Sequence, residues 1–365
     1  MRILIVGGTG VFGSRLARLL ANDPRLELIL AGRNEEKAIA AASCLTGPAR
    51  VTAARVKVAD IDAALYEHKP AMVVHCAGPF QGQDYSVAEA AISSGVHYLD
   101  LSDGREFCDG FCKLDYRAKE AGVAALTACS TTTALTSAAA LELARDMAMV
   151  RRIYVGVTPG NRAPRGRAVV GAILSYVGEP IPVLRNGVMS KTTGWGALSK
   201  MALPGLSTRW FSPCDAPDIL AMRQLFPSAQ SIDFSAGLEL SVLHLPLWVL
   251  AKLRRWRVIP NLAQASGAFH QVARWFEPFG TDQGGMFVEL EGTGNDGRRL
   301  RRRWSLWAGS GEGPYIPAIP AAIMAKSLAA GAQLQPGARL TARDVSLAQF
   351  EEEFAKLNIK TQIEE

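Results

Sequence analysis

Cysteine is scarce in this chain, and its spacing is not that of a disulfide framework. Six cysteines are spread over 365 residues, at Cys44, Cys76, Cys108, Cys112, Cys129 and Cys214. In small secreted domains the cysteines instead lie close together in a short chain. No basic segment with an apolar core and a small-residue cleavage site precedes Arg2. From both absences we expect a reducing, cytoplasmic environment.

Clustered metal ligands and a basic binding face are also missing. Cys108 and Cys112 share a helix face at positions i and i+4, but thiolate sites need further ligands nearby, so we expect no metal.

Lysine and arginine exceed aspartate and glutamate by 40 − 34 = 6, and much of this excess lies in residues 298–303. A nucleic-acid-binding face needs spread basic residues and a binding motif, so we expect no nucleic-acid partner. The arginine run predicts a strand with a solvated face; contact with phosphate, anionic lipid or an acidic substrate is the alternative.

Long uninterrupted apolar runs are absent as well. The most apolar stretch, residues 236–253, is interrupted by Glu239, His244 and Pro246, whereas a membrane-spanning helix needs about 20 apolar residues with few charges. Three arginines follow it by residue 257. The pattern predicts a buried helix. An interfacial helix in peripheral contact with a membrane, or the lid of an apolar substrate cavity, is the alternative.

The first third of the chain alternates short apolar runs with helical patterns, which is typical of a parallel sheet covered by helices. The expected strands are Arg2–Val6, Leu26–Ala31, Ala53–Val58, Met72–Cys76, His97–Leu101 and Val123–Thr127. The expected helices follow Gly10 and cover Glu35–Ser43, Ile61–Tyr66, Ser86–Ser94 and Phe107–Glu120. Six such strands are what two mononucleotide-binding halves require. The sequence therefore predicts an α/β fold with a doubly wound parallel sheet of Rossmann type.

Beyond about Ser130 the pattern changes to strands mixed with many turns. A strand at Arg151–Thr158 precedes a loop at residues 159–167, and Gly285–Gly292 and Leu300–Ala308 predict a hairpin. Helices are expected at Ile319–Gly331 and Ser346–Leu357. The length and this change of pattern together predict two domains.

A glycine-rich turn joins the first strand to the first helix. Gly7 permits the tight turn, Gly10 lets the backbone approach a pyrophosphate, and Gly13 lets the helix pack closely on the strand. The unpaired N–H groups of the helix start, aided by its dipole, bind phosphate. Strand, turn and helix in this order are the context that the spacing requires. We expect the dinucleotide to be contacted by Gly7, Thr9, Gly10, Val11, Phe12 and Gly13.

The end of the second strand indicates which dinucleotide is bound. A carboxylate about 20 residues beyond the last glycine suits the ribose 2′-hydroxyl of NAD, whereas a cation suits the 2′-phosphate of NADP. This chain has Arg33 and Asn34 there, with Lys37 one helical turn further on. The sequence therefore predicts NADP(H), unless Arg33 is only a solvated loop residue.

Two further strand ends are expected along the cofactor groove, because ligands bind outside the carboxyl ends of parallel strands. Asp60 follows the third strand and is expected to contact adenine, to cap the next helix, or both. Ala77, Gly78, Pro79 and Phe80 follow the fourth strand, where glycine allows backbone approach near the ribose and nicotinamide.

These residues resemble the saccharopine dehydrogenase-like oxidoreductases. The resemblance rests on the turn at residues 7–13, on Ala31-Gly32-Arg33, on residues 76–80, on the helix at 87–91 and on Gly95–Ser102. The segment from Cys76 to Asp103 is much more specific than the glycine turn. The resemblance covers residues 1 to about 130, weakens through the middle, and returns near residues 303–306 and 313–321.

The resemblance implies a domain organisation and a class of reaction. It implies a Rossmann domain of residues 1–130, completed by residues 312–365, and an inserted mixed α/β domain of residues 131–311 for substrate binding and dimerisation. It implies hydride transfer between NADP(H) and a small-molecule substrate with a C=N bond of the amino acid and keto acid type, a C=O or a C=C bond. We accordingly expect a homo-oligomer.

The chain departs from the saccharopine-forming branch of that family at two points. It has Phe80 where those enzymes usually carry Tyr, and residues 129–134 read Cys-Ser-Thr-Thr-Thr-Ala where a Leu-Asp-Pro-Gly turn is usual. These departures argue against saccharopine as the substrate, and a bulky or lipid-like substrate fits the apolar stretch at residues 236–253 better.

Three residues are candidates for the chemistry beside the cofactor. Asp100 ends the fifth strand and is the first candidate for handling a proton or binding an amine, although it equally suits a helix cap or turn. Tyr98 lies two residues earlier on the same strand face. Cys129 follows the sixth strand, where semialdehyde dehydrogenases place a thiol nucleophile; such a thiol needs a base and a lowered pKa, and a buried inert thiol is the alternative.

Two other functions stay open beside the NADP-dependent oxidoreductase. One is a redox sensor that binds NADP(H) without catalysis, and the other is a semialdehyde dehydrogenase that uses Cys129. A short-chain dehydrogenase is disfavoured, because none of the seven tyrosines has a lysine four residues later.

Overall fold

The computed structural model describes residues 1–164 and 167–365, which divide into two compact units. The first unit contains residues 1–135 and 314–350, and the second contains residues 136–313 and 351–365. The predicted limits differ from this division mainly at the end of the chain, since residues 351–365 belong to the second unit. The predicted loop at 159–167 falls partly on residues 165–166, outside the described residues.

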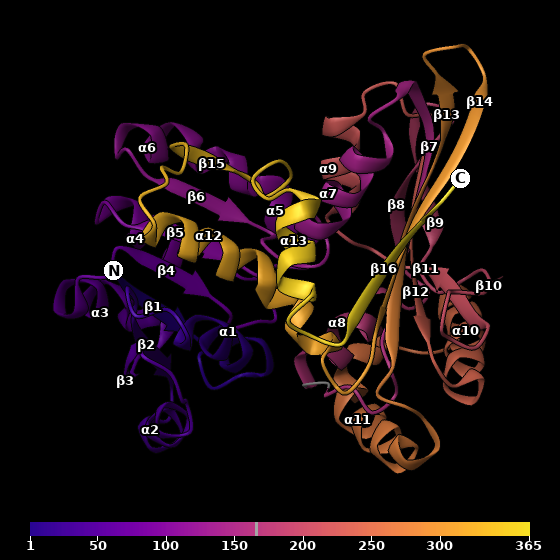
Figure 1. Cartoon of the computed structure of the whole chain (residues 1–365). Coiled ribbons are helices and arrows are strands. Elements are labelled where there is room, and N and C mark those ends of the chain that lie inside the picture. Colours follow the sequence, from indigo (N-terminus) through magenta and orange to yellow (C-terminus); the bar gives the residue numbers. More distant parts are fainter. Residues whose placement is uncertain (165–166) are drawn as a thin grey trace. The chain divides into compact units, whose positions relative to one another are not determined.

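The first unit is a seven-stranded parallel sheet with helices on its faces (Figure 1), so the predicted fold class is confirmed. The strand order is β15-β6-β5-β4-β1-β2-β3. In chain order the elements are β1 (Arg2–Val6), α1 (Val11–Ala21), β2 (Glu27–Gly32), α2 (Glu35–Ser43), β3 (Arg50–Arg55), α3 (Ile61–His68), β4 (Met72–His75), α4 (Ser86–Ser93), β5 (His97–Asp100), α5 (Arg105–Gly110), α6 (Asp115–Glu120), β6 (Ala124–Thr127), α12 (Ile319–Ala329) and β15 (Gly337–Leu340).

The local patterns of the first third correspond closely to these elements, with two corrections. The third strand lies at Arg50–Arg55 instead of Ala53–Val58, because a 3₁₀ turn at Val58–Asp60 already leads into α3. The predicted helix at 107–120 is divided into α5, a 3₁₀ turn and α6. At the division, a Cβ on Gly110 would lie 2.3 Å from the Tyr85 hydroxyl oxygen. Glycine there leaves room for the Tyr85 side chain.

The sheet has a seventh strand that the sequence pattern did not predict. β15 comes from the C-terminal segment and pairs in parallel with β6, from Gly337 opposite Ala124 to Leu340 opposite Thr127. Its four residues are too few to show a period of their own. The central strands are fully buried, as in β1, where Ile3, Leu4 and Ile5 have no exposed surface. Continuous apolar runs are what a parallel sheet covered on both faces requires.

The second unit is built on a nine-stranded mixed sheet, seven of whose strands follow in the order β10-β11-β12-β7-β13-β14-β16. β7 and β12 are parallel, and β8 pairs with both β12 and β9. The elements are α7 (Ala134–Leu143), β7 (Met147–Thr158), α8 (Arg167–Tyr176), β8 (Pro180–Arg185), β9 (Val188–Thr193), β10 (Ser199–Met201), β11 (Arg209–Pro213), α9 (Asp218–Leu225), β12 (Ser231–Leu238), α10 (Ser241–Arg255), α11 (Ser266–Trp275), β13 (Gly284–Gly294), β14 (Arg299–Ala308), α13 (Leu347–Phe354) and β16 (Ile359–Glu364). The chain passes between the units at three points, one within α7, one between Gly313 and Pro314, and one within α13.

The predicted hairpin is confirmed, and its arginine strand is bound to acidic residues. β13 and β14 pair from Gly284 opposite Ala308 to Thr293 opposite Arg299. The buried carboxylate of Glu289 accepts hydrogen bonds from Arg301 and Arg303, at 3.0 Å and 2.6 Å for the shortest contacts. Much of the arginine run is therefore neutralised within the sheet. Strand β16 at the end of the chain was not predicted.

The apolar stretch at 236–253 is not one buried helix as predicted. Residues 231–238 form β12, because they pair with β7 and β11, and helix α10 begins only at Ser241. Of its fifteen residues, His244, Leu247 and Ala251 are buried. Among the described residues, no helix combines the length and the apolar composition needed to cross a membrane.

A buried ion pair ties the loops at one end of the second unit's sheet. Arg209 at the start of β11 lies 3.5 Å from the Glu239 carboxylate, and both side chains are almost fully buried. Glu239 accepts hydrogen bonds from the backbone N–H groups of Asn161 and Thr281. Arg209 donates to the carbonyls of Thr158, Pro159 and Gln283. The pair thus fixes the ends of β7, β12 and β13 together.

Candidate dinucleotide-binding site

The glycine-rich turn has the close packing that its sequence predicts. Gly7 has φ +81°, a left-handed conformation, and a Cβ there would lie 2.9 Å from the backbone nitrogen of Ala77. A Cβ on Gly13 would lie 2.3 Å from the Gly7 carbonyl oxygen. Larger residues at either position would force the turn, β4 or α1 to move. The turn is held against β2 by hydrogen bonds from the Gly7 and Gly8 N–H groups to the Ala31 carbonyl.

The N-terminus of α1 presents unpaired backbone donors. Gly10 is the N-cap, no side chain of the described chain caps the helix, and its first turn contains no acidic residue. The first intrahelical bond runs from the Ser14 N–H to the Gly10 carbonyl, so the N–H groups of Val11, Phe12 and Gly13 have no intrahelical acceptor. Thr9 and Gly10 are exposed beside them. This arrangement suits a phosphate group, because donors and helix dipole favour negative charge.

The end of β2 places cationic side chains in solvent, where a second phosphate can bind. Arg33 and Lys37 are both exposed, and Lys37 lies in the first turn of α2. The Asn34 side chain caps that helix, since its oxygen accepts a hydrogen bond of 2.9 Å from the Lys37 N–H. A Cβ on Gly32 would be 3.4 Å from the Thr9 hydroxyl oxygen. The end of β2 therefore lies beside the glycine-rich turn.

The loops after β3 and β4 complete this edge of the sheet. Asp60 is exposed at the N-cap position of α3 but makes no capping hydrogen bond with its side chain. Ala77 packs against Gly7, as the glycine contact shows. Gly78 and Pro79 are exposed and joined by a cis peptide bond. Phe80, in contrast, is 3% exposed and packs edge-on against His75, with ring centroids 5.0 Å apart.

Asp100 holds the ends of β5 and β6 together. Its Oδ1 atom accepts hydrogen bonds of 2.9 Å from the Ser102 N–H, the Ala128 N–H and the Thr127 hydroxyl. Ala128 has φ +54°, a left-handed conformation that costs a non-glycine residue about 1–2 kcal/mol. The carboxylate therefore supports a strained turn at the end of β6. Such strain is common near functional sites.

Tyr98 and His75 extend this buried cluster. The Tyr98 hydroxyl hydrogen-bonds to Nδ1 of His75 at 3.2 Å. His75 stands opposite Asp100 in the register of β4 and β5. Its Nε2 atom is buried and has no hydrogen-bond partner among the described residues. Sequence reasoning identified Asp100 and Tyr98 but missed His75, whose only signal is its place at the end of the fourth strand.

Burial changes the proton affinity of all three side chains. It raises the pKa of Asp100 to about 6, although hydrogen bonds from Ser102, Ala128, Thr127 and Tyr98 oppose the shift. Burial lowers the pKa of His75 to about 4, so its imidazole is neutral near pH 7. Burial also raises the pKa of Tyr98, and the Asp100 charge adds to this. Only Asp100 therefore titrates within reach of neutral pH.

The surroundings of Cys129 oppose a nucleophilic thiolate. The side chain is fully buried, and its sulfur lies 3.7 Å from the Met324 sulfur. Burial raises the pKa of the Cys129 thiol, and the negative charges of Asp344 and Asp100 add to this. A reactive thiol needs the opposite setting, a neighbouring cation or base and some exposure. His244, a conceivable base, belongs to the second unit and is bound to Ser212 Oγ at 2.9 Å.

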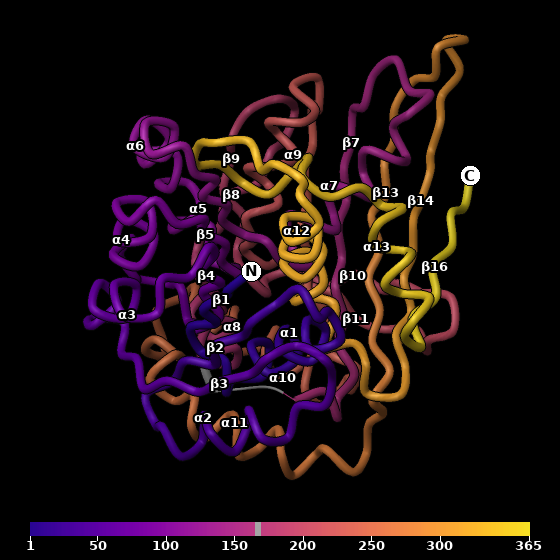
Figure 2. Tube along the Cα trace, turned by 60° about the vertical axis from the view of Figure 1, so that its left-hand side comes forward, coloured from indigo at the N-terminus to yellow at the C-terminus, as the bar shows by residue number. Residues whose placement is uncertain are grey.

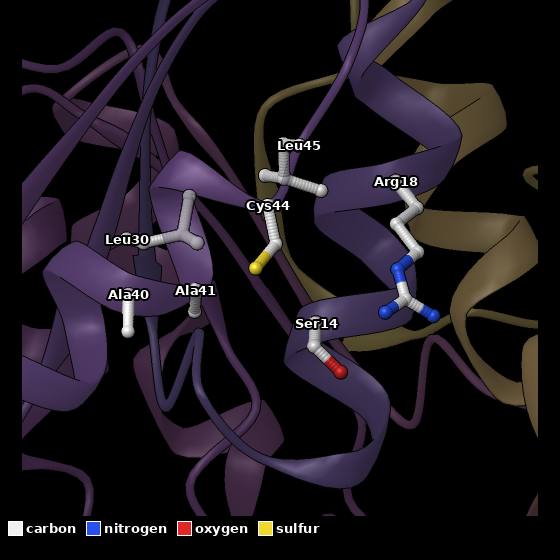
Figure 3. A pocket seen from close by; sticks show the side chains of 7 residues that line it. All are labelled: Ser14, Arg18, Leu30, Ala40, Ala41, Cys44 and Leu45. Carbon is white, nitrogen blue, oxygen red and sulfur yellow. The ribbon is translucent and has the colours of Figure 1, made fainter.

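A cavity of about 280 Å³ lies elsewhere in the first unit (Figure 3). It is lined by Ser14 and Arg18 of α1, Leu30 of β2, Ala40 and Ala41 of α2, and Cys44 and Leu45, which follow α2. None of the predicted cofactor contacts lines this cavity. It is a groove between two helices and not part of the edge at which the strands end.

Comparison with known proteins agrees with this geometry. Residues 3–128 match the sequence model of the family described as saccharopine dehydrogenase NADP binding domain. The resemblance predicted from the sequence is therefore confirmed over this part of the chain. The cofactor predicted from the second strand, NADP(H), is the one that the family binds.

Solved structures extend the likeness to the whole chain. The saccharopine dehydrogenase (L-Glu forming) of Saccharomyces cerevisiae is 13% identical, with all of both chains covered and a TM-score of 0.68. The homospermidine synthase of Legionella pneumophila, solved in complex with NAD, is 9% identical and has a TM-score of 0.62 over 100% of this chain and 90% of that chain. At such identities the likeness establishes the fold alone. A comparison with curated proteins found no sequence match.

Proposed function

We propose that this protein is an NADP-dependent oxidoreductase that transfers a hydride to or from a C=N, C=O or C=C bond of a small-molecule substrate. The observation that carries the proposal is the uncapped start of α1 behind Gly7, Gly10 and Gly13, in a domain of an NADP-binding family. Two structural neighbours with the same fold over the whole chain act in amino acid and polyamine chemistry by their names. This favours a C=N substrate first.

In this proposal the cofactor phosphates are bound at two places on one edge of the sheet. The N–H groups of Val11, Phe12 and Gly13 hold the pyrophosphate, and the side chains of Arg33 and Lys37 hold the 2′-phosphate. The start of α1 suits the pyrophosphate, because its backbone N–H donors have no intrahelical acceptor and its first turn has no acidic residue to repel an anion. When bound, NADPH supplies the hydride from its nicotinamide ring.

The chain itself must position the substrate and manage a proton. We assign Asp100, Tyr98 and His75 as a buried proton-holding cluster near the ends of β4 and β5. A carboxyl with a pKa of about 6 can hold a proton and release it near neutral pH. Tyr98 connects it to the neutral His75 imidazole. Cys129 has no part in this mechanism, because its burial opposes the thiolate.

The cofactor part of the proposal is tested by titration with NADPH and NADH. We expect the chain to bind NADPH more tightly, and Arg33→Ala to remove most of the difference. Loss of one charge-assisted phosphate contact corresponds to about 1.5–3 kcal/mol, or at least a tenfold weaker affinity for NADPH with little change for NADH. Arg50→Ala is the matched control, since its side chain is 75% exposed at the opposite end of the sheet. Equal affinities in the wild type would refute the assignment of Arg33.

The catalytic part is tested by turnover. NADPH oxidation should be followed with paired amines and keto acids, and then with carbonyl and enoyl compounds of increasing chain length. Asp100→Asn should lower kcat and remove a pH dependence near 6 while leaving NADPH binding intact. Binding without turnover on any substrate, with wild-type behaviour of Asp100→Asn, would favour the non-catalytic redox sensor instead.

We also propose a reducing, cytoplasmic setting and a homo-oligomer formed through the second unit. Cys44, Cys76, Cys108, Cys112 and Cys129 are free thiols, which agrees with the first. Sedimentation of the purified chain tests the second.

A further inference from the structure

Helix α10 carries an apolar face on its outer side as well as on its inner side. His244, Leu247 and Ala251 face inward and are buried. On the opposite side Val242, Val249 and Trp256, the last of which is the residue just after the helix, recur at intervals of seven. They are 55%, 46% and 69% exposed. A surface helix normally presents polar residues on that side. The apolar composition of this exposed face therefore indicates that it binds a partner.

The other residues on the outer side continue the apolar stripe. A helix advances about 100° per residue, which places Leu245, Pro246 and Leu253 between the three exposed residues. Pro246 is exposed, and the two leucines are half-buried. These six positions form a stripe about 100° wide with no charged residue in it. Lys252 lies at its edge. We call these six residues the outer stripe of α10.

The segment of the chain that contains this stripe carries basic side chains and no acidic ones. Residues 240–276 contain five lysines and arginines and no aspartate or glutamate. Arg254 binds Glu179, whereas Arg255, Arg257 and Arg274 are exposed. This segment of 37 residues thus carries a formal charge of +5.

Neighbouring segments of the same unit add exposed aromatic side chains. α10, α8 and α11 share one small core around Leu174, Trp195 and Leu247, and α10 and α11 lie near each other in both views (Figures 1 and 2). Trp275 at the end of α11 is 65% exposed, and Phe279 shortly after it is 73% exposed. Exposed tryptophan and phenylalanine among basic residues are typical of membrane-interface segments.

We propose that the outer stripe of α10 docks on the surface of an anionic phospholipid bilayer. The helix lies along the interface, with Val249 and Trp256 at the boundary between headgroups and acyl chains, and the arginines meet lipid phosphates. It does not cross the bilayer, since the helix has fifteen residues and a span needs about 20. A second copy of this chain is disfavoured as the occupant, because two such faces would bring the exposed arginines at positions 255 and 257 of both copies together. This function is independent of the proposed reaction.

The proposal is tested by sedimentation of the full chain with two kinds of vesicle, one of phosphatidylcholine alone and one that also contains phosphatidylglycerol. We expect binding to the anionic vesicles, weak binding to the neutral ones, and a loss of binding as salt is raised. Tryptophan fluorescence should shift to the blue on binding. No binding to anionic vesicles would overturn the proposal.

Two sets of variants test whether vesicle binding depends on the outer stripe or is nonspecific adsorption to lipid. Trp256→Ser should weaken vesicle binding at least about tenfold, and Arg255→Glu with Arg257→Glu should weaken it at least as much. All three side chains are exposed, so the fold is expected to be retained. Unchanged binding in either variant would refute the assignment of this face.

Matched controls change equally exposed residues elsewhere. Val188→Ser and Tyr66→Ser remove side chains that are 65% and 82% exposed, and Lys113→Glu with Lys191→Glu reverses two other exposed charges. These variants should bind like the wild type. A dimer in solution that dissociates on Trp256→Ser would assign the face to a second copy and overturn the proposal.

Discussion

Substitution of Gly13 by alanine tests the physical basis of the nucleotide site most directly. The added Cβ would lie 2.3 Å from the Gly7 carbonyl oxygen and 2.9 Å from the Gly7 carbonyl carbon and Gly8 Cα. The closest favourable carbon–oxygen contacts are about 3.3 Å long, so the start of α1 must move from the turn by about 1 Å. All three neighbours are backbone atoms that cannot rotate away.

Overpacking of this kind costs about 1–3 kcal/mol. We expect Gly13→Ala to destabilise the first unit by that amount and to weaken NADPH binding at least tenfold, since each 1.4 kcal/mol corresponds to about a tenfold change. Binding suffers because the displaced N–H groups of Val11 and Phe12 are the proposed phosphate donors.

Gly10→Ala separates packing from binding. Gly10 has φ −78°, which any residue adopts, and a Cβ there would meet only the Gly7 oxygen, at 3.2 Å. We therefore expect stability within about 1 kcal/mol of the wild type. Binding should still be weakened, because the methyl group occupies the surface where the pyrophosphate approaches.

The assay must report on the first unit alone. All seven tryptophans lie between residues 195 and 307, in the second unit, so their fluorescence reports on that unit. Hydrogen exchange of the amides in β1 and α1 reports on the first. Wild-type exchange protection and wild-type NADPH affinity in Gly13→Ala would refute the packing argument.

Two further predictions concern buried charges. Burial raises the pKa of Asp100 from 3.8 to about 6, so the folded state binds its proton more tightly than the unfolded state does. The stabilisation from this group is complete only below the unfolded-state pKa of 3.8 and is lost as the pH rises through 6. Between pH 4 and pH 7 the unfolding free energy of the wild type should therefore fall by about 2 kcal/mol relative to that of Asp100→Asn, measured by urea unfolding at both values. Glu239→Gln leaves Arg209 buried without its counter-charge and should cost the second unit about 3–5 kcal/mol, measured by urea unfolding followed by tryptophan fluorescence. A cost below 1 kcal/mol would show instead that the carbonyl groups around Arg209 balance its charge.

The candidate site could be predicted only where a single segment determines it. The turn from Gly7 to Gly13 needs glycine because of contacts within a few residues, and the cationic end of β2 follows one strand later. The partnership of His75, Tyr98 and Asp100 could not be predicted in the same way. It depends on the register of β4 against β5, and the loss of solvent that moves the pKa of Asp100 depends on every layer packed over it.

The same limit applies to the fold. The hairpin of β13 and β14 was predicted because its strands are adjacent in the chain and are joined by a loop of turn-forming residues that includes Gly294, Asn295, Asp296 and Gly297. β15 and β16 are short segments that become strands by pairing with β6 and β14, and nothing in their own residues requires it.

The sequence by itself determined the βαβ unit and its glycine-rich turn and predicted NADP(H) as the cofactor, because backbone conformation and helix-terminal donors depend on neighbours within a turn or two. Only the tertiary structure decided that Cys129 is a fully buried thiol, that Asp100 supports a strained turn, and that the apolar stretch after residue 240 presents a second face to solvent. Burial is set by segments far apart in the chain, and a single segment does not encode which of its faces they will cover.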